Sequence, residues 1–202
     1  MIAIIDYGMG NLYSVHKAFT MLGAETVITS DASVIENAEK VILPGVGAFG
    51  DCMKNLVDYK LVEVIRHIIK RGTPFLGICL GLQLLFESSE EDPEVEGLKI
   101  FPGVVRKIEA PGFKIPHMGW NSLKFQANSR LFAGMPANSY VYFVHSYHAV
   151  PKAPGIITAV ANYGGTVTAA VGYGNVQAVQ FHPEKSSSVG LKILANFKEL
   201  KL

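Results

Sequence analysis

The sequence is short of the features that mark secreted, membrane-spanning and nucleic-acid-binding proteins. It has only two cysteines, Cys52 and Cys79, so no disulfide framework is expected. No apolar run approaches the roughly 20 residues that span a bilayer, and the first residues do not have the pattern of a signal peptide. The net charge is +1, which gives no electrostatic basis for binding nucleic acid or a charged membrane. We therefore expect a cytoplasmic protein with neither of these partners.

The composition of the chain favours a single globular domain over residues 1–202. Hydrophobic residues make up 49% and charged residues 17%, and there is no repeat, linker or low-complexity segment. In the first half, short apolar segments alternate with amphipathic ones, as parallel strands alternate with helices. The expected strands are 2–5, 25–29, 40–43 and 73–78, and the expected helices are 11–22 and 51–71.

The pattern changes after residue 95 to strand-like segments separated by turn residues. These segments are 103–109, 121–125, 140–145, 156–162, 167–172 and 176–181, followed by a closing helix over 191–200. Together the two halves predict an α/β fold: a doubly wound, mostly parallel sheet with helices on both faces, plus an antiparallel excursion.

One pentapeptide, Gly77-Ile78-Cys79-Leu80-Gly81, joins a predicted strand to a predicted helix over 82–87. A reactive side chain with glycine two residues away on each side is the pattern of a nucleophile elbow, in which a sharp turn exposes the central residue. The alternative is a buried structural cysteine, since cysteine is among the most buried residue types. The pentapeptide alone does not decide between them. Cys52, early in the predicted helix 51–71, is expected to be a core residue.

A glycine-containing loop, Pro44-Gly45-Val46-Gly47, follows the third predicted strand. In a doubly wound sheet the carboxyl ends of neighbouring strands open into one crevice, so this loop is expected near Cys79. Backbone N–H groups there, from Val46 and from Leu80 after the nucleophile, are predicted to form an oxyanion hole.

His182 and Glu184 are the predicted base and its orienting group. His182 ends the apolar segment 176–181, so it too is expected at a strand end. In an extended chain residues i and i+2 point to the same side, which lets Glu184 hold one ring nitrogen while the other faces Cys79. A neighbouring histidine favours the thiolate, the stronger nucleophile.

Two other interpretations of the sequence, a dinucleotide-binding loop and a zinc site, are not supported. Gly8-Met9-Gly10 follows a strand, but Tyr13 stands where a dinucleotide-binding fingerprint has its third glycine. The segment 145–148 has two histidines, but neither Cys-x-x-Cys nor His-Glu-x-x-His occurs, so zinc is not expected. Polar residues of 145–148 are expected to line the crevice or its edge. No cofactor and no metal are predicted.

The combination of 44–47, 77–83 and 182–184 resembles class I glutamine amidotransferases. Segments 6–12, 116–121, 142–147 and 182–186 are similar, more narrowly, to the glutaminase subunits of imidazole glycerol phosphate synthases. The resemblance covers essentially the whole chain, and no catalytic position departs from it.

The resemblance implies a reaction and a partner. Cys79 would attack the side-chain amide of L-glutamine, with His182 moving protons and Glu184 orienting it, through a γ-glutamyl thioester. The ammonia would pass to a (β/α)₈-barrel cyclase subunit that makes imidazole glycerol phosphate and aminoimidazole carboxamide ribotide in histidine biosynthesis. The residues implied to hold glutamine are Gly45, Gly47, Gln83, Glu91, Ser146 and Tyr147. Those implied to contact the partner are Asn11, Trp120, Tyr142 and Lys185.

The family also implies weak activity without the partner. One hypothesis is that the Gly45–Val46 peptide presents its N–H to the oxyanion only after the partner and its ligand bind.

Three alternatives remain open at this point: an amidotransferase subunit of another pathway, a stand-alone cysteine hydrolase, and a regulatory or redox-sensing domain with a reactive cysteine. The segments containing Gly-Met-Gly-Asn and His-Met-Gly-Trp-Asn argue against the first. The absence of a secretion pattern weakens the second. An oriented base argues against the third, because sensing does not need one.

Overall fold

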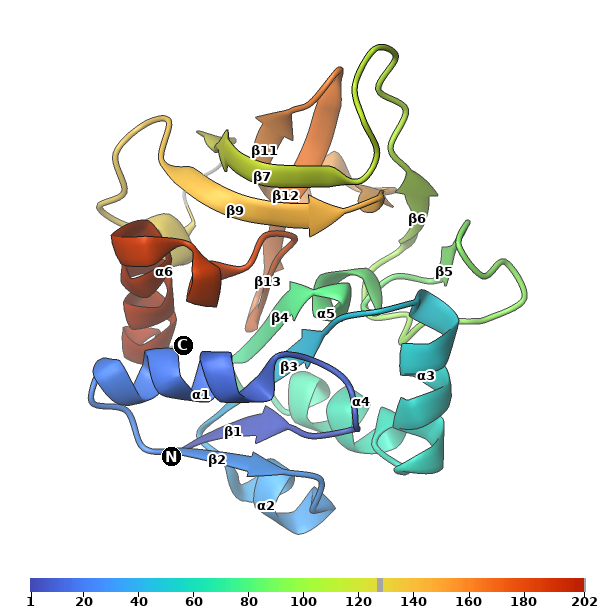
Figure 1. Ribbon diagram of the computed structural model, residues 1–202. Helices are drawn as coiled ribbons and strands as arrows, with labels where there is room; N and C mark the ends of the chain where they lie inside the picture. The colour runs from blue at the N-terminus through green and yellow to red at the C-terminus, as the bar shows by residue number, and fades with distance from the viewer. Residues whose placement is uncertain (127–128, 202) are drawn as a thin grey trace.

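A mostly parallel sheet forms the centre of the molecule. The computed structural model describes residues 1–126 and 129–201. Within them an eight-stranded sheet has the order β2-β1-β3-β4-β13-β12-β11-β8 (Figure 1). The parallel strands are β2 (Thr26–Thr29), β1 (Ile2–Ile5), β3 (Lys40–Gly45), β4 (Phe75–Cys79) and β13 (Val176–Val179). The antiparallel strands are β12 (Thr166–Tyr173), β11 (Ile157–Asn162) and β8 (Lys124–Phe125). The predicted doubly wound sheet with an antiparallel excursion is confirmed.

Helices cover both faces of this sheet because side chains along a buried strand alternate between the faces. On one face Ile2 and Ile4 pack in a core with α1 (Leu12–Met21) and α6 (Ser187–Glu199). On the other face Ala3 and Ile5 pack in a core with the remaining helices, which are α2 (Ala32–Asn37), α3 (Phe49–Asp58), α4 (Val62–Lys70) and α5 (Leu80–Gln83). None of the helices in the described part of the chain has the length and apolar content that crossing a membrane requires.

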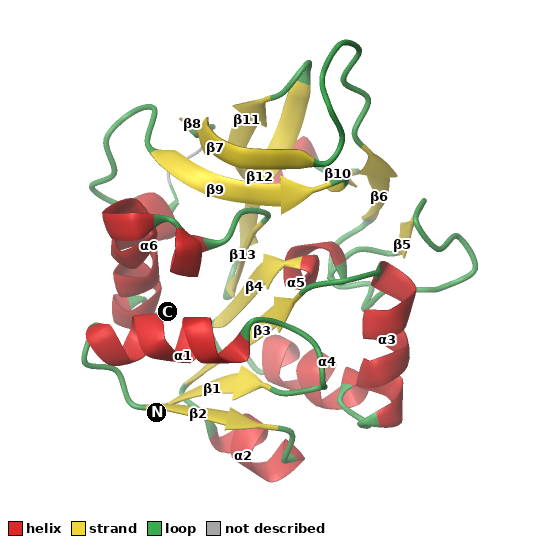
Figure 2. Ribbon diagram, in the orientation of Figure 1, coloured by secondary structure: helices red, strands yellow, loops and turns green. Residues whose placement is uncertain are grey.

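In the described part of the chain, two smaller sheets lie outside the central one. β7 (His117–Ser122) and β9 (Tyr140–His145) form an antiparallel ribbon, which Figure 2 shows above β4 and β13. β10 (Tyr147–Pro151), β6 (Gly103–Lys107) and β5 (Ser88–Ser89) form the other. Short 3₁₀ helices lie in the connections between β8 and β9, between β10 and β11, and between β13 and α6, namely η1 (Arg130–Phe132), η2 (Pro154–Ile156) and η3 (Pro183–Lys185).

Several predicted elements differ from the structure. The single helix expected over 51–71 is two helices, α3 and α4, because Lys60 between them takes a left-handed conformation with φ +58°. The helix expected over 82–87 is the four-residue α5, which begins at Leu80. The strand expected over 121–125 is divided between β7 and β8.

Some elements were not predicted, among them α2, β5 and β10. α2 begins after Asp31, whose carboxylate accepts hydrogen bonds from the backbone N–H groups of Ser33 and Val34. β10 pairs with β6.

Candidate active site

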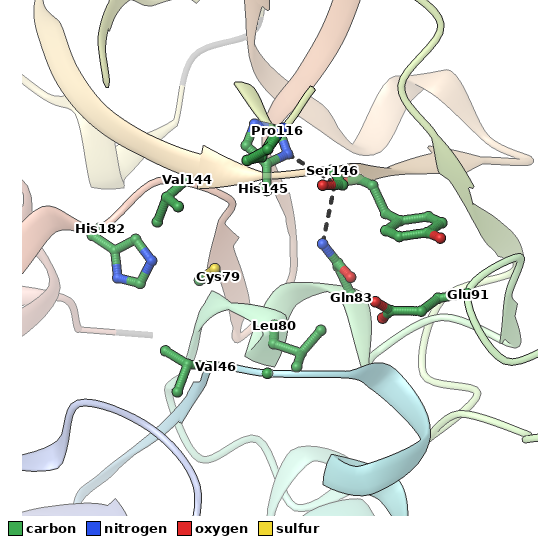
Figure 3. A pocket seen from close by; sticks show the side chains of 12 residues that line it. Val46, Cys79, Leu80, Gln83, Glu91, Pro116, Val144, His145, Ser146 and His182 are labelled. Atoms are coloured by element: carbon green, nitrogen blue, oxygen red, sulfur yellow. Dashed lines mark hydrogen bonds between the residues drawn. The ribbon is translucent and has the colours of Figure 1, made fainter. Parts of the chain in front are cut away.

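One cavity, of about 330 Å³, collects most of the candidate residues. It lies where β3 and β4 end and where the chain leaves β13, which is where open α/β sheets bind ligands. Its size lies in the range of small-molecule sites. Figure 3 shows the residues that line it, which are Val46, Gly47, Cys79, Leu80, Gln83, Glu91, Pro116, Val144, His145, Ser146, Tyr147 and His182.

Cys79 stands at a sharp turn between β4 and α5. Its backbone has φ +56° and ψ −110°, a conformation that side chains rarely adopt and that is typical of a nucleophile elbow. The flanking glycines make the turn possible. A Cβ on Gly77 would lie 2.7 Å from the carbonyl oxygen of Gly81, and a Cβ on Gly81 would overlap the backbone carbonyl of Leu43. The cysteine therefore sits in strained backbone at the edge of a cavity, and the alternative of an ordinary core cysteine does not explain that strain.

His182 and Glu184 form a buried pair. Nδ1 of His182 lies 2.8 Å from Oε1 of Glu184, and the exposed fractions of the two side chains are 3% and 1%. The extended geometry expected for 182–184 is wrong, because Pro183 starts η3 and the tight turn brings the carboxylate to the ring. The backbone of His182 is also fixed: its N–H donates to the carbonyl of Tyr142, and its carbonyl accepts from the hydroxyl of Ser186.

The charge of His182 depends on both of its neighbours. Burial acts to lower the pKa of His182, but the nearby sulfur of Cys79 and then the Glu184 carboxylate outweigh it and raise that pKa to about 10. Nε2 has no hydrogen-bond partner among residues 1–126 and 129–201, so the influence of Cys79 reflects its closeness rather than a formed hydrogen bond. A raised pKa means that the imidazolium persists at neutral pH and loses its proton only as the pH approaches 10.

We expect Cys79→Ala to lower the pKa of His182, because it removes the larger of the two influences that raise it while burial still opposes the charge. An NMR titration of the imidazole in the two proteins measures the change. His145 is an internal control, since burial lowers its pKa to about 3 and it stays neutral in both proteins. An unchanged His182 titration would contradict the inferred coupling to Cys79.

The predicted oxyanion loop lies at the cavity. Val46, Gly47 and Leu80 line it. Gly45 is not a lining residue and packs beneath: a Cβ there would meet the Tyr7 hydroxyl at 2.8 Å and Leu80 Cβ at 2.9 Å. Gly45 is thus a position of close approach to Tyr7 and Leu80. Its contact with glutamine stays a prediction.

The other residues expected to hold glutamine line the same cavity. Nε2 of Gln83 donates to the carbonyl of Tyr147, at 3.2 Å, and to Oε1 of Gln180, at 3.0 Å. One oxygen of Glu91 accepts from the backbone N–H of Phe49 at the start of α3, at 2.8 Å. Glu91 therefore also satisfies a helix end, which the sequence did not indicate. Ser146 lies between β9 and β10.

The four residues expected at a partner interface come from neighbouring elements. Trp120 on β7 is directly opposite Tyr142 on β9, with ring centroids 6.2 Å apart. Lys185 lies in η3, and Asn11 precedes α1; both α1 and β9 contact η3.

Two kinds of site residue were missed by sequence reasoning. Pro116 and Val144 line the cavity. The strand 140–145 was predicted with the bounds of β9, and its alternation places Val144 on the same face as Tyr142, a signal that could have found it. Tyr7 and Cys52 lie behind the oxyanion loop, and no local signal marks them.

Across the described ranges there is no group of three or more His, Cys, Asp and Glu side chains placed to hold a metal ion.

The fold and the site, a strained cysteine at a cavity with a buried histidine–carboxylate pair, are typical of the class of proteins that attack a carbonyl group with a thiol. The family model described as "Glutamine amidotransferase class-I" matches residues 3–200. The chain belongs to this class-I glutamine amidotransferase family, in the branch of the imidazole glycerol phosphate synthase subunits HisH.

The relatives that place it there match over nearly their whole length. The imidazole glycerol phosphate synthase subunit HisH of Moorella thermoacetica is 52% identical over 199 residues, which cover 98% of this chain and 94% of the relative. That of Aquifex aeolicus is 51% identical over 196 residues, 96% of this chain and 94% of the relative.

Solved structures agree on the fold. A glutamine amidotransferase structure has a TM-score of 0.76 at 19% identity, covering 98% of this chain and 100% of the other. The structure of PurLQS from Thermotoga maritima has a TM-score of 0.73 at 19% identity, covering 98% and 96%.

Proposed function

We propose that this chain is the glutaminase subunit of an imidazole glycerol phosphate synthase, hydrolysing L-glutamine to glutamate and ammonia for histidine biosynthesis. The observation that carries the proposal is the placement of Cys79 and the His182–Glu184 pair at one cavity, in a chain whose relatives of about 50% identity have that name. Residues 1–202 are proposed to act as one amidotransferase domain, in keeping with a family match over 3–200.

The proposed reaction uses Cys79, His182 and Glu184 together. The thiolate attacks the amide carbon of glutamine, and the N–H groups of Val46 and Leu80 bind the oxygen as it becomes negative. The His182 imidazolium gives its proton to the departing nitrogen, so ammonia leaves and a γ-glutamyl thioester remains. The now neutral imidazole removes a proton from water, which attacks the thioester and releases glutamate. Glu184 holds the ring and stabilises its cationic form throughout.

The glutamine is proposed to lie between the oxyanion loop and β10. Gln83, Ser146 and Tyr147 offer polar groups along one wall, and Gln83 Oε1 is buried without a partner among the described residues. A substrate N–H group would satisfy that oxygen, whose burial is otherwise costly. The other oxygen of the Glu91 carboxylate suits the ammonium group of the amino acid.

The proposed partner is a (β/α)₈-barrel cyclase subunit that binds over the β7–β9 ribbon and forms a heterodimer. Along β9, Val144 reaches the cavity while Tyr142 and Tyr140 follow on the same face. Across the ribbon, Met118 and Trp120 expose 60% and 52% of their surfaces. An exposed apolar face that continues into the active site suits a partner that receives ammonia. Asn11, Trp120, Tyr142 and Lys185 are proposed to contact it.

The proposed location is the cytoplasm. Cys52 and Cys79 are both free thiols in the structure. Unpaired cysteines, one of them the proposed nucleophile, suit a reducing compartment.

A glutaminase assay with and without the cyclase subunit of the same organism tests the proposal. We expect weak release of glutamate by the isolated chain and strong release once the cyclase subunit and its nucleotide ligand are added. The ammonia should appear in the cyclase products rather than in solution. High activity of the isolated chain that the cyclase subunit leaves unchanged would contradict the proposal and favour a stand-alone hydrolase.

A further inference from the structure

The loop that carries the proposed oxyanion donor is held from behind by two side chains outside the cavity. The hydroxyl of Tyr7 donates to the carbonyl oxygen of Pro44, at 2.9 Å. The thiol of Cys52 donates to the carbonyl oxygen of Val46, at 3.5 Å. Tyr7 comes from the loop after β1 and Cys52 from the first turns of α3, so two distant segments meet behind one loop.

The two hydrogen bonds fix the peptides on either side of the proposed donor. The Pro44 carbonyl belongs to the Pro44–Gly45 peptide, and the Val46 carbonyl belongs to the Val46–Gly47 peptide. Between them lies the Gly45–Val46 peptide, whose N–H is the one proposed to bind the oxyanion. Because the peptides on both sides are held by hydrogen bonds, the planar central peptide can change its orientation only by rotating between two fixed ends.

The donor and acceptor count supports this arrangement. Tyr7 and Cys52 each supply one proton, and the two carbonyl oxygens each accept one. The Tyr7 oxygen lies 3.6 Å from the Cys52 sulfur, so the two anchors also contact each other. Both side chains are 0% exposed, where water cannot replace either bond.

Both groups keep their protons at neutral pH. Burial raises the pKa of Cys52 to about 11, although the neighbouring Tyr7 hydroxyl acts in the other direction. Burial, followed by the nearby cysteines, raises the pKa of Tyr7 well above its ordinary value. Each therefore remains a donor at neutral pH.

We propose that Tyr7 and Cys52 are positioning residues that hold the oxyanion loop, so that the N–H of Val46 can bind the oxyanion during glutamine hydrolysis. This inference rests on the proposed function. An oxyanion donor stabilises the transition state more than the bound substrate, so loss of an anchor lowers kcat and leaves KM nearly unchanged.

Three variants in the complex with the cyclase subunit and its ligand test the inference. Tyr7→Phe removes one anchor, Cys52→Val removes the other at similar volume, and Cys52→Ser keeps a donor. We expect the first two to lower kcat for glutamine by about tenfold to 100-fold, less than the roughly 10³-fold upper limit for losing a whole oxyanion donor. KM should change by less than about twofold, and Cys52→Ser should recover most of the loss.

Alkylation of Cys79 by iodoacetamide distinguishes a loss of oxyanion-loop positioning from a general disturbance of the active site. Alkylation displaces iodide and forms no oxyanion, so its rate should match wild type in Tyr7→Phe and Cys52→Val. Tyr163→Phe is a matched control: it removes a hydroxyl that donates to the Lys114 carbonyl and does not line the cavity, so kcat should stay at the wild-type value.

The outcomes are distinct. Wild-type kcat in both variants, a parallel loss of alkylation and turnover, or Cys52→Ser as slow as Cys52→Val would each overturn the positioning role while leaving the proposed function standing. A wild-type complex without glutamine turnover would instead overturn the proposed function.

Discussion

Replacing Cys79 by alanine lowers glutamine hydrolysis by at least about 10³-fold, because no other side chain at the cavity can form the thioester. The proposed function adds a second expectation. In the complex, Cys79→Ala keeps the use of free ammonia by the cyclase subunit, since that reaction does not need the thiol. Turnover is measured with glutamine and with an ammonium salt as alternative nitrogen donors.

The ammonium reaction serves as the control for folding and assembly. A variant that loses both activities has lost the complex and not only the nucleophile. A variant that keeps glutamine-dependent turnover would remove Cys79 from the mechanism. A binding or sensing domain without catalysis would show no glutamine-dependent turnover in the wild-type protein either.

Replacing Gly81 by alanine destabilises the fold by about 3 kcal/mol or more, an effect in the upper range for single substitutions. The new Cβ would overlap the carbonyl of Leu43, a backbone atom of β3 that cannot move alone because Leu43 is paired with Gly77 of β4. Relief therefore requires β3 and β4 to separate or the elbow to open, and either change displaces Cys79. Denaturant unfolding measures the free energy, and Cys79 alkylation reports on the elbow.

Gly155→Ala is the matched control for this substitution. A Cβ on Gly155 meets no atom within 4 Å, so the same change should alter the free energy of unfolding by less than about 0.5 kcal/mol. If Gly81→Ala were as stable as Gly155→Ala, the elbow would not depend on close packing against β3.

Most of the central sheet was predictable because its signal is local. Buried strands such as β1 and β3 are continuous apolar runs, and they were predicted to within two residues. The break between α3 and α4 was not predictable from periodicity. Both helices bury apolar faces in the same core, so the apolar repeat continues across Lys60, where neither glycine nor proline marks the turn.

The residues of the candidate site were likewise predictable only where their signal is local. Cys79 ends β4, and His182 and Glu184 follow shortly after the end of β13; strand order brings these two ends together. The 3₁₀ turn that brings Glu184 to His182 was not predicted, since the sequence predicted an extended segment there. The anchors Tyr7 and Cys52 depend on three segments meeting behind the oxyanion loop, and this information exists only in the folded chain.

The central claim is that Cys79 attacks the side chain of glutamine in the cavity. It is tested most directly with a glutamine analogue that carries an electrophile in place of the side-chain amide. Tandem mass spectrometry of the labelled protein locates the modified residue. We predict one label, on Cys79, with glutamine protecting against it. A label on another residue, or labelling of Cys79 that saturating glutamine does not slow, would contradict the account.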